Sequence, residues 1–283
     1  MERELRALRE PGERRAVKVM RKYRQIMRVH LKAQLAWRAD VVFSMLFTVA
    51  KILFAWLLWG MIFRERNTVA DFTFHGMLSY YIVSSFLSQL EMSRGISGEI
   101  SARIRNGTFS NYIVMPLSIE GYFAAMELGV VLFYLCFDLL AAMVWIFVFR
   151  IQFVFAEGAV ALLCGLSMAV LGLFFMVQLN VFLGILTLKY EEISTFLMIK
   201  DNLVSLVTGS IVPLALFPDA VVRVMRLLPF YYVTYLPSML LVGRCGEEAA
   251  GGLIVLGAWC VLMQILTMAT WRKYRKKYDG VGV

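Results

Sequence analysis

Several apolar runs, each near 20 residues or longer, constrain this chain more than any other feature. A helix rises about 1.5 Å per residue, so about 20 apolar residues cross the roughly 30 Å of hydrocarbon in a bilayer. Hydrophobic residues make up 60% of the sequence and charged residues only 17%, which is unlike the composition of a soluble domain. We therefore expect an all-α, polytopic integral membrane protein.

Six apolar segments are predicted to span the membrane. They are residues 40–63, 75–92, 119–149, 158–186, 203–217 and 249–270, with a charged link at 189–201. The fifth segment is short and is interrupted by Pro213, and Pro218, Pro229 and Pro237 punctuate the apolar stretch that follows. Proline breaks helices, and irregular backbone at membrane depth must be shielded by protein or water. Residues 213–241 are therefore predicted to form a re-entrant region.

The distribution of charge divides the chain into three parts. Residues 1–38 hold twelve Lys and Arg against four Glu, with apolar residues spaced by three or four from Arg14 onward. This pattern predicts a basic amphipathic helix on an anionic membrane surface, and nucleic acid is a poorer partner because the helix adjoins a span. Residues 39–271 form the six-span domain, and residues 272–283 form a basic tail. The side of the membrane with both termini holds 22 Lys and Arg, against six on the other side. By the positive-inside rule, we expect the side with both termini to be cytoplasmic.

A polar segment, residues 94–116, separates the second and third predicted spans. It contains three arginines and an isoleucine at every fourth position: Arg94, Arg103, Arg105, Ile96, Ile100 and Ile104. That spacing places the isoleucines on one face of a helix. Asn106 and Gly107 then tolerate the left-handed conformation at which helices end. We expect a short helix over residues 94–107, which either docks into a partner outside the lipid or rests on headgroups as a connector.

Polar side chains inside the predicted spans are the other candidates for function. They are Lys51, Glu127, Asp138, Gln178 and Asn180. An ionisable group at the bilayer centre costs about 2.5–3.5 kcal/mol on insertion scales, so such groups usually face protein or water. Lys51 and Glu127 lie at similar predicted depth, which leads to the hypothesis that they form an ion pair; alternatively, Glu127 lies among headgroups and Lys51 snorkels. Gln178 and Asn180 would bond either a neighbouring helix or a substrate.

The sequence contains none of the motifs that indicate catalysis or a metal site. It has no GxxxxGK[ST], HExxH or GxSxG motif, and its four cysteines are scattered without a CxxC pair. We therefore expect no catalytic residue, no metal ligand and no bound cofactor in this chain.

Residues 104–116, IRNGTFSNYIVMP, resemble the I-R-x-G-x-[LF]-x-x-Y-x-x-x-P signature of type-2 ABC exporter permeases. The pieces GSIVPL (209–214), FP (217–218), LPF (228–230) and YLP (235–237) are similar to the re-entrant region of that family, and WRKY (271–274) with YDG (278–280) to its ending. The order of these parts also resembles the family, from about Tyr23 to the end of the chain.

This resemblance implies the permease subunit of an ATP-driven exporter in the cell membrane. The residues implied to couple to a separate ABC ATPase subunit, which would hold ATP and Mg, are Arg94, Glu99, Ile100, Arg103, Ile104, Arg105 and Gly107. A second permease, identical or a sister subunit, would complete the path for an amphipathic drug, peptide or lipid-like molecule. Two other functions remain open, a stand-alone secondary transporter or channel and a membrane-embedded enzyme.

Overall fold

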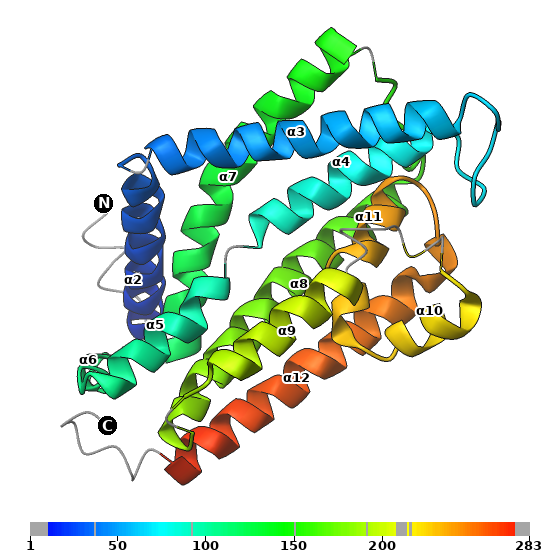
Figure 1. Ribbon diagram of the computed structural model, residues 1–283. Coiled ribbons are helices and arrows are strands. Elements are labelled where there is room, and N and C mark those ends of the chain that lie inside the picture. The colour runs from blue at the N-terminus through cyan, green and yellow to red at the C-terminus, as the bar shows by residue number, and fades with distance from the viewer. Residues whose placement is uncertain are drawn as a thin grey trace.

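The computed structural model describes residues 11–36, 38–91, 93–149, 151–190, 192–207, 214 and 217–274 (Figure 1). The α-helices are α2 (Pro11–Gln34), α3 (Arg38–Ile62), α4 (Phe74–Leu90), α5 (Arg94–Arg105), α6 (Ser110–Ile113), α7 (Ile119–Phe149), α8 (Ala159–Ile185), α9 (Ser194–Val207), α10 (Asp219–Met225), α11 (Tyr235–Leu241) and α12 (Ala249–Tyr274). Short 3-10 helices are η1 (Leu186–Leu188), η3 (Pro229–Tyr232) and η4 (Gly246–Glu248). Apart from one isolated β-bridge, Val69 with Phe72, the regular structure of the described residues is helical, as predicted.

Three helices of the described chain are long and apolar enough to cross a membrane, judged by length and composition. They cover Ile119–Met143, Ala159–Leu188 and Gly246–Tyr274, and they coincide with the predicted third, fourth and sixth spans. In α3 the apolar part is shorter, Leu46–Ile62, and α4 and α9 have 17 and 14 residues. The count of six spans therefore stays a prediction.

The central helix of the bundle is α8, which packs against α5, α7, α11 and α12. Its glycines permit close approach. A Cβ on Gly172 would lie 3.0 Å from the Cα of Val233, and a Cβ on Gly165 would lie 3.0 Å from the Cγ of Leu241. Small residues at crossings are a common means of bringing membrane helices together. The segment between α10 and α12 is thereby tied to the bundle.

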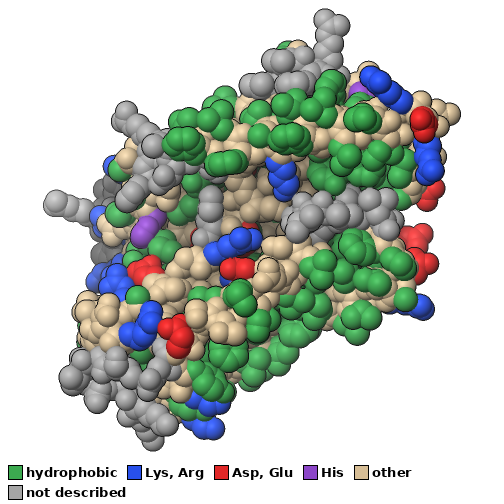
Figure 2. All heavy atoms as spheres, viewed as in Figure 1, with side chains coloured by type: hydrophobic (Ala, Val, Ile, Leu, Met, Phe, Trp, Pro, Cys, Tyr) green, Lys and Arg blue, Asp and Glu red, His purple; other side chains and the backbone are tan. Residues whose placement is uncertain are grey.

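The bundle has two ends that differ in content (Figure 1). At one, which we call the basal end, lie α5, α6, the start of α2 and the end of α12. At the other, the distal end, lie α10 and the loop between α3 and α4. In Figure 2, charged side chains gather mainly at these two ends, with a few in a hollow below α3, whereas hydrophobic side chains cover α3 and much of the surface between. This is the distribution expected of a protein whose middle lies in hydrocarbon.

The start of α9 differs from the prediction. Residues 189–201 were expected to form a charged link, but α9 begins at Ser194 and includes Lys200 and Asp201. Lys200, Val204 and Val207 recur at helical spacing, and all three are buried against the bundle. Hydropathy alone scores Lys200 as a polar residue, whereas its long side chain can be buried once its ammonium group is bonded. The boundary prediction was wrong for this reason.

The proline-rich segment forms short, separate helices. Pro218 precedes α10, Pro229 begins η3, and Pro237 lies in the first turn of α11. Proline is tolerated at these positions because the first turn of a helix has no internal partner for its N–H groups. Pro213 lies outside the described residues. The re-entrant assignment of residues 213–241 stays a prediction.

The amphipathic helix α2 packs along α7. Two glycines of α7 receive it: a Cβ on Gly129 would lie 2.3 Å from the Met27 carbonyl oxygen, and a Cβ on Gly121 would lie 2.6 Å from the Tyr23 hydroxyl. A larger residue at position 129 would require movement of the α2 backbone, whereas one at position 121 would require the Tyr23 and Ser118 side chains to move. The helix is therefore fixed to α7 at close range, in addition to any contact with a membrane surface.

Candidate functional site

The isoleucine stripe of α5 faces the core of this chain. Ile96, Ile100 and Ile104 are no more than 1% exposed, and they pack with side chains of α7 and α8. At the closest approach, a Cβ on Gly184 of α8 would lie 2.7 Å from the Cβ of Ile100. The family resemblance implies that Ile100 and Ile104 couple to the ATPase. In this structure both hold α5 against α8, and their part in coupling stays a prediction. An apolar stripe predicts that a face is buried and does not say against what.

The charged side of α5 is ordered by bonds within the chain. Arg103 pairs with Glu99 at 3.1 Å, and its guanidinium lies 5.0 Å from the centroid of the Tyr112 ring. The Tyr112 hydroxyl donates to the same Glu99 carboxylate at 2.7 Å. Burial, and next the bond to Glu99, raises the pKa of Tyr112 above its ordinary value, so the phenol keeps its proton at neutral pH. Arg105 pairs with Glu192 at 3.2 Å, which links α5 to the segment before α9.

The end of α5 is a left-handed glycine cap. Gly107 has φ of 70°, and its N–H donates to the Ile104 carbonyl at 3.2 Å. The Thr108 N–H donates to the Arg103 carbonyl at 2.9 Å. These two bonds make a Schellman motif, which satisfies carbonyls that the helix leaves open at its end. The predicted helix end at Asn106 and Gly107 is confirmed.

A buried polar network joins the start of α5 to two other helices. We call Glu91, Ser93, Asn180 and Lys200 the α5–α9 network; each is no more than 8% exposed. The Asn180 amide of α8 donates to the Ser93 hydroxyl at 2.8 Å, and the Lys200 ammonium of α9 donates to the Asn180 Oδ1 at 2.9 Å. The Ser93 hydroxyl donates in turn to Glu91. Hydrogen bonds thus run from the junction of α4 and α5, through α8, to α9.

Each charge within the network has a counter-ion at its edge. Glu91 pairs with Arg94 at 3.4 Å, and Lys200 pairs with Asp201 at 2.9 Å. Burying a charge is costly unless it is paired and hydrogen-bonded, and removing one partner of such a pair is strongly destabilising. The network therefore holds the α4–α5 junction, α8 and α9 in one fixed arrangement.

A family model for ABC-2 family transporter proteins matches residues 48–282 of this chain, a range that includes α5 and the whole α5–α9 network. The chain belongs to the ABC-2 transporter family. No match was found among the curated proteins. Family membership makes this a multi-pass membrane protein and a permease component of an ABC transporter, and it implies association with ABC ATPase subunits.

In this ABC-2 permease, the other polar residues of the predicted spans lie apart from one another. Lys51 lines an open groove between α3 and α4, whereas Glu127 is 4% exposed on α7, and the ion pair between the two stays a prediction. Asp138 is 3% exposed, and its Oδ2 has no hydrogen-bond partner in the described part of the chain. Gln178 donates to Gln264 of α12 at 2.9 Å and so bonds a neighbouring helix.

Sequence reasoning missed three members of the α5–α9 network, which are Glu91, Ser93 and Lys200. A signal existed for Lys200, because it lies four residues before Val204 on an apolar stripe. For Ser93 there was none, because its partner Asn180 lies on a helix 87 residues away in the ABC-2 permease. Glu91 bonds its sequence neighbours Ser93 and Arg94, but nothing in the local sequence indicated that Glu91 would be buried.

Proposed function

We propose that this ABC-2 permease works in an ATP-driven exporter in which α5 is the coupling helix. A separate ABC ATPase subunit, holding ATP and Mg, would dock on the exposed side of α5 at the basal end, and that end would face the cytoplasm. A second permease, identical or a sister subunit, would complete the translocation path. The cargo would be an amphipathic drug, peptide or lipid-like molecule.

The observation that carries this proposal is the double attachment of α5 to the bundle. Ile100 is seated on Gly184 without room for a methyl group, and Ser93 is bonded through Asn180 to Lys200. Close-packed interiors transmit displacement because they have few voids to absorb it. A push on the exposed side of α5 would therefore move α8 and α9, which is what coupling to an ATPase requires.

The exposed side of α5 suits close docking of a partner. Gly95 and Gly98 lie on it, and a Cβ added at either would meet nothing within 4 Å. Glycine allows the backbone of a partner to approach closely. Arg94 and Arg105, whose side chains are 54% and 44% exposed, flank this surface and favour an acidic partner. Exposed charges of this kind set orientation more than affinity.

A second permease is suggested by the open groove between α3 and α4. Its volume is about 400 Å³, and Thr48, Lys51, Ser88 and Gln89 line it along with Phe47. Polar and ionisable groups on membrane helices face protein or water in preference to lipid. A partner permease covering this groove would enclose a path with both polar and apolar walls, which is suited to an amphipathic cargo.

The proposal is tested by photo-crosslinking from α5 in inverted membrane vesicles that contain the intact transporter. A benzophenone amino acid at position 98 should crosslink to a protein that also binds an azido-ATP probe and carries a P-loop. The same probe at Leu227, which is 72% exposed beside α10 at the distal end, serves as the control and should give no such product. Crosslinking from position 227 and not from position 98 would contradict the assignment.

A stand-alone secondary transporter is the second candidate, and Asp138 is the observation that favours it. The buried Asp138 carboxylate has one oxygen without a hydrogen-bond partner among the described residues. Buried carboxylates of this kind are typical of proton-coupled carriers. The two functions differ in their energy source. If the purified chain alone, reconstituted in liposomes, drives uptake from a proton gradient and Asp138→Asn abolishes that uptake, the carrier function is supported instead of the exporter.

A further inference from the structure

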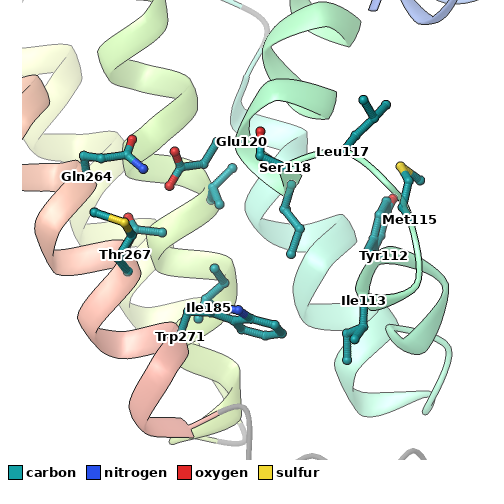
Figure 3. Close-up of a pocket in the computed structure, with 13 residues that line it drawn as sticks. Tyr112, Ile113, Met115, Leu117, Ser118, Glu120, Ile185, Gln264, Thr267 and Trp271 are labelled. Atoms are coloured by element: carbon teal, nitrogen blue, oxygen red, sulfur yellow. The ribbon is translucent and has the colours of Figure 1, made fainter. Parts of the chain in front are cut away.

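At the basal end, a crevice of about 320 Å³ opens between α7 and α12, with α8 as its floor (Figure 3). The end of α6, the start of α7 and the connector between them form one wall. Four residues of α12 form the other: Gln264, Thr267, Met268 and Trp271. Most of the remaining lining is aliphatic. None of the residues in the α5–α9 network lines this crevice.

The crevice lies at the depth where a membrane helix meets headgroups. Trp271 lines it in the last turns of α12, and Arg272 and Lys273 follow directly. Tryptophan and basic residues are enriched at the membrane interface. Farther from the basal end, α12 exposes large apolar side chains, including Val261 at 61% and Ile265 at 54%. The crevice therefore opens onto a surface that suits lipid chains, beside a level that suits their headgroups.

One carboxylate, that of Glu120, enters the crevice from the first turn of α7 (Figure 3). Within the described residues, Glu120 has no Lys or Arg partner. Its neighbour across the crevice is Gln264, whose Oε1 already accepts from Gln178 at 2.9 Å. That bond leaves the Gln264 amide nitrogen for Glu120, and a carboxylate with one amide donor still has several acceptor sites open.

A second polar group with hydrogen-bonding capacity to spare, the Thr267 hydroxyl, lines the same crevice. Thr267 is 3% exposed, and its Oγ1 has no hydrogen-bond partner among the described residues. It lies one helical turn from Gln264 on α12, on the side that faces Glu120 (Figure 3). Buried hydroxyls are normally satisfied, so a ligand with a polar head beside an apolar body would complete the site.

We infer that this crevice binds a phospholipid with a primary amine in its headgroup, such as phosphatidylethanolamine. The ammonium group would donate to the Glu120 carboxylate, and the acyl chains would follow the apolar surface of α12. A primary ammonium donates three hydrogen bonds, whereas the trimethylammonium of phosphatidylcholine donates none and phosphatidylglycerol carries no cation. The site should therefore discriminate headgroups, and this inference is independent of the proposed coupling function.

The test uses the full chain, purified in detergent and titrated with dioleoyl-phosphatidylethanolamine, -phosphatidylcholine and -phosphatidylglycerol, with retained lipids counted by native mass spectrometry. We expect the ethanolamine lipid to bind about tenfold more tightly than the other two, the size expected for a hydrogen bond between charged groups. Equal retention of all three lipids, or a preference for the glycerol lipid, would overturn the inference without need of any variant.

Glu120→Gln should remove the preference for the ethanolamine lipid and leave weak, equal binding of all three. Glu157→Gln is the matched control, because it deletes one exposed carboxylate between α7 and α8 at the other end of α7. It should keep the wild-type preference. If Glu120→Gln keeps the preference, or if both variants lose it, the assignment of headgroup recognition to Glu120 is wrong. Glu120→Asp keeps the charge and should keep the preference, which separates loss of the carboxylate from a failure to fold.

Discussion

The Lys200 ammonium of α9 donates a hydrogen bond of 2.9 Å to the Oδ1 of Asn180 on α8, and both side chains are buried. The same Asn180 donates from its nitrogen to Ser93 at the start of α5. One amide group therefore bonds two other segments at once. Its two ends are not interchangeable, since the oxygen must face Lys200 and the nitrogen must face Ser93.

Lys200→Met should destabilise the protein by about 1–3 kcal/mol, because it leaves the Asn180 oxygen buried without its donor. The measurement is the thermal unfolding midpoint of the purified protein in detergent. Lys189→Met is the matched control, since Lys189 lies on the exposed segment just before α9. Equal midpoints for the two variants would show that the network does not hold α9.

Gly184→Ala should force α5 away from α8, because its Cβ would lie 2.7 Å from the Ile100 Cβ. Overpacking of this kind costs about 1–3 kcal/mol. Gly257→Ala in α12 is the control: a Cβ there meets nothing within 4 Å, so the change should be neutral or stabilising by up to about 1 kcal/mol. Chemical denaturation of the two variants side by side checks this, and a stable Gly184→Ala variant would contradict the close seating of Ile100.

Gly107→Val should weaken the end of α5, whereas Gly107→Asn should be tolerated. Gly107 has φ of 70°, a left-handed conformation that costs an ordinary residue about 1–2 kcal/mol and asparagine less. The difference is measured as protease sensitivity of the segment around residues 106–116, with Gly95→Ala as a control on the same helix. Similar cleavage rates for Gly107→Val and Gly107→Asn would argue against the Schellman end of α5.

His30 should make the protein less stable in mildly acidic solution. Burial against α7 lowers its pKa below the ordinary value of 6.5, and the negative charge of Glu99 offsets this only in part. The unfolded chain takes up the proton at about pH 6.5, whereas the folded chain does so only at lower pH, so stability falls as the pH drops below 6.5.

The variant His30→Phe should lack this part of the pH dependence. It keeps a ring beside Tyr122, whose centroid lies 6.3 Å from that of His30. Unfolding midpoints at pH 7.5, 6.5 and 5.5 give the comparison between the variant and the wild type. Parallel pH curves for the variant and the wild type would contradict the pKa direction.

The long helices and the end of α5 could be predicted from the sequence because their causes are local. Continuous apolar runs specified α7, α8 and α12, and a single glycine specified the turn at residue 107. Contacts between distant segments had no local signal. The stripe of Ile96, Ile100 and Ile104 predicted a buried face but not that α8 would cover it.

The candidate sites, too, could be predicted from the sequence only where the signal is local. Asn180 could be singled out as a polar residue in a span, but its partners Ser93 and Lys200 lie 87 and 20 residues away in the sequence. Glu120 lies at the very start of a predicted span, and nothing in its local sequence indicates a binding residue. Its environment depends on Gln264, which only the packing of α12 against α8 brings near.

The glycine contacts between α2 and α7 make these two helices one mechanical piece. The Met27 carbonyl is seated where Gly129 has no side chain, and Tyr23 occupies the space beside Gly121. A surface helix held only by lipid can rotate or slide. Because α2 packs closely against two glycines of α7, it follows the tilt of α7. Any rocking of α7 during a transport cycle must therefore move the basic side chains of α2 with it.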